Sequence, residues 1–63
     1  MNPDAEIIQS AYQDALKRLY STLVNQYTEA AGAEQAQNQA DRHFSTGVAI
    51  ARKTRDRAVV LLG

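Results

Sequence analysis

The sequence EAAGAEQ, residues 29–35, divides this chain at Gly32 into two segments of nearly equal length. Glycine adopts the left-handed backbone conformation that ends many helices at a lower cost than other residues. We therefore predict a helix over residues 3–31, a turn around residues 32–33 and a second helix over residues 34–62. The predicted fold is all-α, an antiparallel two-helix hairpin in a single domain spanning residues 1–63.

The first predicted helix has a marked start and a wide apolar face. Asn2 suits the N-cap position, and Pro3 suits the first helical position because its missing N–H would be unpaired there in any case. Apolar side chains then recur at helical spacing from Ile8 to Ala30 and cover about half of the circumference. Because a simple two-helix seam needs only a narrow band, we expect this helix to contact two neighbours.

The second predicted helix carries small residues on the face expected to pack against the first helix: Ala36, Ala40, Gly47, Ala51 and Ala58. Small residues let two helix axes approach toward the short end of the roughly 8 to 10 Å range. Four large side chains of the first helix are expected to fill the space opposite them: Leu16, Leu19, Tyr20 and Leu23. Glycine inside a helix costs about 1 kcal/mol relative to alanine, so close packing is the favoured role of Gly47, ahead of a hinge or a binding contact.

The charges balance overall but not between the two segments. The sequence has seven Lys and Arg residues and seven Asp and Glu residues, so its formal net charge is zero. No net field therefore attracts nucleic acid or an anionic membrane. The first segment has four acidic and two basic residues, a net of −2, and the second has three acidic and five basic residues, a net of +2. This complementarity favours the antiparallel hairpin and predicts that the basic residues 52–57 pair with Glu6 and Asp14.

A chain of 63 residues needs support beyond its own core. A domain of this size buries only about 60% of the surface that its unfolded chain exposes. The sequence has no cysteine and one histidine, so association with a partner is the support that remains. We predict a homodimeric four-helix bundle. The residues expected at the interface between the copies are Tyr12, Leu16, Tyr20, Val24, Tyr27, Phe44, Val59 and Leu62.

The sequence holds no convincing catalytic or metal-binding arrangement. Asp41, His43 and Ser45 have the residue types of a catalytic triad, but positions two apart on a helix point about 200° apart and cannot converge. His43 has no second histidine or cysteine to share a metal with, and the isolated glycines form no phosphate-binding loop. We expect no enzymatic activity, no metal and no cofactor.

We interpret the chain as a non-catalytic protein–protein interaction module, a small adaptor or regulator that acts as a helical-bundle oligomer and binds a second copy and another protein. The alternative is a small nucleic-acid-binding regulator, in which a basic patch duplicated by dimerisation contacts phosphates. That patch comprises Arg52, Lys53, Arg55 and Arg57. Residues 58–62, the longest apolar run, are too few to span a bilayer, and residues 1–6 lack the pattern of a secretory signal, so we expect a cytoplasmic protein.

Overall fold

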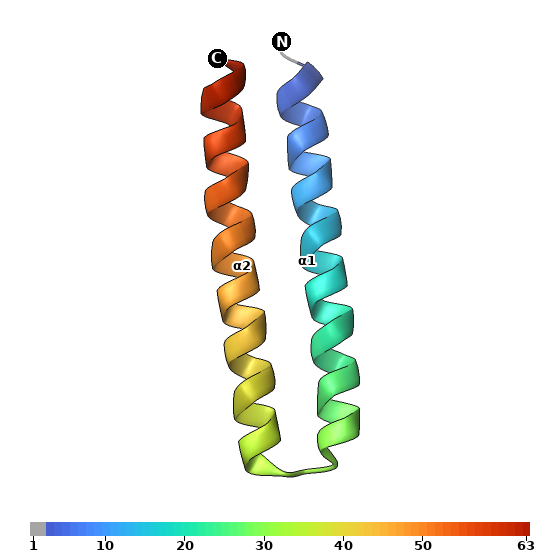
Figure 1. The fold of residues 1–63 in the computed structure, drawn as a ribbon. Coiled ribbons are helices and arrows are strands. Elements are labelled where there is room, and N and C mark those ends of the chain that lie inside the picture. Colours follow the sequence, from blue (N-terminus) through green and yellow to red (C-terminus); the bar gives the residue numbers. More distant parts are fainter. Residues whose placement is uncertain (1–2) are drawn as a thin grey trace.

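The computed structural model describes residues 3–63 and consists of two helices, α1 (Pro3–Ala30) and α2 (Glu34–Leu62). The helices lie side by side and antiparallel, so the beginning of α1 and the end of α2 are neighbours (Figure 1). This confirms the all-helical hairpin. Asn2, the expected N-cap, lies outside the described residues. The Cα atoms extend over 47 × 15 × 9 Å, which is the shape of a single layer of two helices.

The turn begins one residue earlier than the sequence indicated. α1 ends at Ala30, and the backbone is left-handed at both Ala31 (φ 49°) and Gly32 (φ 85°). The N–H of Ala33 donates to the carbonyl of Ala30 at 2.9 Å and closes the turn. Ala33 then serves as the N-cap of α2 without a side-chain hydrogen bond. Gly32 therefore adopts the expected conformation, but the reversal needs two left-handed residues and takes an alanine as the first.

The seam between the helices joins large side chains of α1 to small residues of α2. A Cβ atom built on Gly47 would lie 2.5 Å from Cδ2 of Leu19, so the leucine occupies the space that the glycine leaves open. Ala40 is 2% exposed, and Ala36, Ala51 and Ala58 are half-buried on the same face. Tyr20 does not fill the seam as expected: it lies about 100° around α1 from Leu19 and is 62% exposed.

The hairpin leaves an unusually large share of its surface in solvent. Ala40 is the only buried residue among those described, and no large side chain within residues 3–63 is fully buried. The accessible area is 4889 Å² for a mass of 6.9 kDa. A compact protein of that mass exposes about 4000 Å², so the hairpin has an excess of about 900 Å². The excess follows from the single-layer architecture, because each helix has one neighbour.

Candidate interaction surface

One broad side of the hairpin gathers exposed apolar residues of α1, and we call it the tyrosine face. It comprises Leu16, Tyr20, Leu23, Val24 and Tyr27 of α1 with Asp41, Ser45, Val48 and Arg52 of α2. The hydroxyl of Tyr27 donates a hydrogen bond to the carboxylate of Asp41, which places these two residues on the same side. Within each helix the other members follow one another at intervals of three or four residues, so they lie on that same side.

Aromatic and aliphatic groups dominate the α1 half of the tyrosine face. Tyr20 is 62% exposed, and Val24 and Tyr27 are exposed as well, whereas Leu16 and Leu23 are half-buried. Leu23, Val24 and Tyr27 also line a shallow hollow of about 450 Å³. Tyrosine is enriched in protein interfaces because its ring is apolar while its hydroxyl tolerates water. The surface is open and apolar, which suits contact with another protein surface.

The hydrogen bond between Tyr27 and Asp41 connects the helices on this side. The bond to Asp41 raises the pKa of the Tyr27 phenol above its usual value of 10.0, with smaller contributions from desolvation and from the negative charge of Asp41. Each contribution favours the neutral phenol. At neutral pH Tyr27 therefore keeps its proton and donates a hydrogen bond to Asp41. Tyr27 was expected at an interface between copies, and its hydrogen bond to Asp41 within the hairpin was not predicted.

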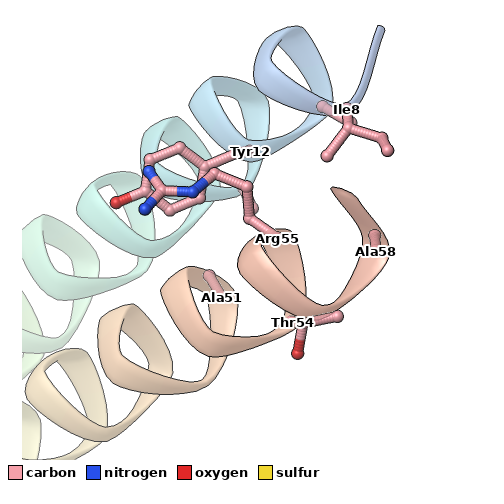
Figure 2. Close-up of a pocket in the computed structure, with 8 residues that line it drawn as sticks. Ile8, Tyr12, Ala51, Thr54, Arg55 and Ala58 are labelled. Atoms are coloured by element: carbon pink, nitrogen blue, oxygen red, sulfur yellow. The ribbon is translucent and has the colours of Figure 1, made fainter. Parts of the chain in front are cut away.

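Arg55 belongs to the hairpin rather than to a free basic patch. Its guanidinium carbon lies 4.4 Å from the centre of the Tyr12 ring, an arrangement typical of a cation–π contact (Figure 2). Its Nε donates to Oδ1 of Asp56 at 3.0 Å, and Nη2 lies 2.9 Å from the same oxygen. The Arg55 side chain is only 26% exposed. Arg55 therefore joins α2 to α1 through an aromatic ring, which the charge pattern did not indicate.

The structure does not bring the four predicted phosphate contacts together. Arg52, Lys53 and Arg57 are exposed, but Arg52 lies on the tyrosine face, whereas Lys53 and Arg57 lie on the outer side of α2. Oδ1 of Asp14, one of the two acidic residues expected to pair with this cluster, lies 4.0 Å from Nζ of Lys17 within α1. The cations thus occupy two separate sides of the helix.

A second shallow groove, of about 370 Å³, lies between the first half of α1 and the last third of α2 (Figure 2). Its lining is mostly apolar and small: Ile8, Ala11, Tyr12, Ala15, Ala51, Thr54, Arg55 and Ala58. The predicted interface residues Val59 and Leu62 lie exposed beyond this groove, whereas Tyr12 and Phe44 are half-buried within the hairpin. The described residues at this end of the molecule form an open groove and an exposed apolar surface.

The residues considered for catalysis remain apart. His43 lies in an open hollow with Ile50, about 200° around α2 from Asp41 and Ser45. No three His, Cys, Asp or Glu side chains in the described chain are grouped so that they could hold a metal ion. Neither described helix is long and apolar enough to cross a membrane.

Gln26 is a polar residue at an inner position that was not predicted. It lies on the inner face of α1, and its Oε1 atom is buried without a hydrogen-bond partner. A buried acceptor left unsatisfied costs about 1 to 3 kcal/mol. The signal was present in the sequence, because Gln26 is seven residues from Leu19 and therefore shares its face.

Comparison with known proteins finds no matching family model, no similar curated protein and no similar solved structure. The function must therefore be argued from the geometry of the hairpin itself.

Proposed function

We propose that the protein is a non-catalytic protein–protein interaction module, a small cytoplasmic adaptor or regulator that acts as a homodimeric four-helix bundle. The observation that carries the proposal is the large exposed area of the hairpin, about 900 Å² beyond that of a compact protein of equal mass. A stable interface buries about 800 Å² on each partner. One partner of ordinary size would therefore remove the excess.

The tyrosine face is the surface that a second layer would cover. Folded domains are built from at least two packed layers around a core, and this hairpin supplies one. A second hairpin laid on Tyr20, Val24 and Tyr27 would convert their exposed rings and methyl groups into the centre of a bundle. Self-association also supplies the stability that a short chain without cysteine does not obtain from disulfides.

The distribution of the cations favours this function over nucleic-acid binding. Arg55 is held by Tyr12 and Asp56, and the exposed cations lie on two sides of α2. A phosphate backbone is bound best by cations that form one continuous patch. The open hollows along the hairpin likewise favour a protein surface as the partner, because small-molecule sites are concave and enclose most of their ligand.

Sedimentation of the purified chain at micromolar concentration tests the proposal. We expect a species of twice the 6.9 kDa chain mass. Tyr20→Glu should shift it to monomer, because a carboxylate would be buried at the interface. Ile7→Glu is the matched control: Ile7 is 65% exposed on the opposite side of α1, and its variant should remain dimeric. A wild-type chain that is folded and monomeric would refute the proposal.

A further inference from the structure

We infer that the second copy docks on the tyrosine face with the two turns at opposite ends, so that α1 lies antiparallel on α1 of the second copy and α2 on α2. This inference rests on the proposed self-association and adds its geometry. Two hairpins stacked face to face by a two-fold axis have only one other arrangement, with both turns at the same end and α1 lying on α2 of the second copy. The residues on the tyrosine face distinguish these arrangements.

The α1 row of the tyrosine face is complementary to itself. Leu16, Tyr20, Leu23 and Tyr27 follow spacings of four, three and four residues, the pattern of a helix–helix seam. A two-fold axis level with residues 21–22 sets Leu16 opposite Tyr27 of the second copy and Tyr20 opposite Leu23. Each of these four residues then faces an apolar or aromatic side chain of the second copy. Residues Gln9 and Gln13, on the same row, lie outside the matched part.

The α2 row, which comprises Asp41, Ser45, Val48 and Arg52, fits the same axis. Leu19 packs against Gly47 and Tyr27 bonds Asp41, so residues 21–22 of α1 lie level with about residues 45–46 of α2. With the axis at that level, Asp41 and Arg52 of the second copy differ in their positions along the helix by only about 3 Å. That offset is within reach of an arginine side chain. The two-fold symmetry repeats the pair, so opposite charges meet twice.

The arrangement with both turns at the same end gives fewer complementary pairs. It would set Tyr20 over Val48 and Tyr27 over Asp41 of the second copy, which are compatible pairs. It would also set Leu16 over Arg52 and Leu23 over Ser45, which are not. Covering Arg52 with a leucine removes water from its charge and provides no acceptor in return, which is unfavourable. Charge and apolar complementarity therefore both select turns at opposite ends. In that arrangement residues 59–62 project beyond the turn of the second copy and stay uncovered.

Two charge-reversal variants test the paired charges. Asp41→Arg alone and Arg52→Asp alone each place like charges opposite each other twice, so each should dimerise roughly tenfold more weakly than wild type. An equimolar mixture should recover wild-type affinity as a heterodimer, because each variant then faces the opposite charge at both sites. Asp41→Arg mixed with Lys53→Asp is the matched control and should recover only in part, since Lys53 lies on the outer side of α2 and one of the two sites in that heterodimer keeps like charges.

Tyr27→Phe serves as a second control, because it measures the effect of losing the hydrogen bond to Asp41 without a change of charge. Sedimentation equilibrium provides the affinities. A wild-type dimer whose charge-reversal variants show no recovery on mixing would overturn the opposite-end arrangement while leaving the proposed function intact. A monomeric wild type would overturn both.

A distance measurement gives a readout that does not depend on affinity. The chain has no cysteine, so Ser10→Cys carries a single nitroxide label at an exposed position of α1. With turns at opposite ends, the two Ser10 positions are separated by about 35 Å along the bundle. With turns at the same end, they lie level and are separated only by the width of the bundle, about 20 Å. A long distance from pulsed electron paramagnetic resonance supports the inference, and the short one overturns it.

Discussion

Replacing Gly47 with alanine should destabilise the hairpin even though alanine is the better helix former. Alanine gains about 1 kcal/mol of helix propensity over glycine. The added Cβ, however, would lie 2.5 Å from Cδ2 and 3.3 Å from Cδ1 of Leu19, where ordinary contacts begin at 3.4 Å. Overpacking of this kind costs about 1 to 3 kcal/mol. The net expectation is a loss of about 1 kcal/mol, equivalent to a Tm lower by about 4 to 8 °C.

Urea unfolding followed by far-ultraviolet circular dichroism measures this loss, at one fixed protein concentration because association adds to apparent stability. Ala49→Gly is the matched control: Ala49 is exposed on the same helix, so its variant reports the propensity term alone, about 1 kcal/mol. In a Leu19→Ala background the clash is absent, and Gly47→Ala should become stabilising by that amount. If Gly47→Ala stabilises equally in both backgrounds, the close approach of Leu19 does not limit the position and the reasoning fails.

Three further changes test local features of the hairpin. Ala31→Gly should raise the free energy of unfolding by about 1 kcal/mol, because residue 31 is left-handed at φ 49°; an unchanged Tm would contradict this. Gln26→Leu should raise the free energy of unfolding by about 1 kcal/mol or more, because it removes the buried unpaired acceptor. Asn25→Leu is the control: Asn25 is exposed on the same helix, so its variant should not raise the free energy of unfolding. Equal effects of the two substitutions would argue against a burial penalty. The raised pKa of Tyr27 means that the bond to the Asp41 carboxylate contributes fully from neutral pH up to pH 10.0 and is lost as the pH rises through the raised value. Unfolding measured against pH should show this loss in wild type and not in Tyr27→Phe, and identical profiles would count against the bond.

The helical hairpin could be predicted because its signals are local. Periodicity places Leu19 and Ala40 on inner faces, and a glycine between two helical segments marks a reversal. The start of the turn at Ala31 could not be predicted in the same way. The cost of a left-handed alanine, about 1 to 2 kcal/mol, is smaller than the gain from packing two long helices, so the packing determines the conformation of Ala31.

The contacts on the surface were less predictable because competing partners differ little in energy. Complementary charge indicated that Arg55 would pair with the acidic start of α1, but an exposed ion pair contributes only about 0 to 1 kcal/mol. Stacking on Tyr12 and pairing with the adjacent Asp56 satisfies the guanidinium equally well. For the same reason a hydrogen bond such as that between Tyr27 and Asp41 follows from the register of the two helices, which helical periodicity does not specify.

The two faces of α1 also predict how folding and association are coupled. One face packs on the small residues of α2, and the other, through Tyr20 and its neighbours, is left exposed by the hairpin. If a second copy covers that exposed face, the stability of wild type rises with protein concentration by mass action. Gly47→Ala alters only the seam within each hairpin, so it should lower stability at every concentration and keep that dependence. Tyr20→Glu should abolish the dependence while the helices of the monomer still form, and a wild-type Tm independent of concentration would mean that the hairpin is stable alone.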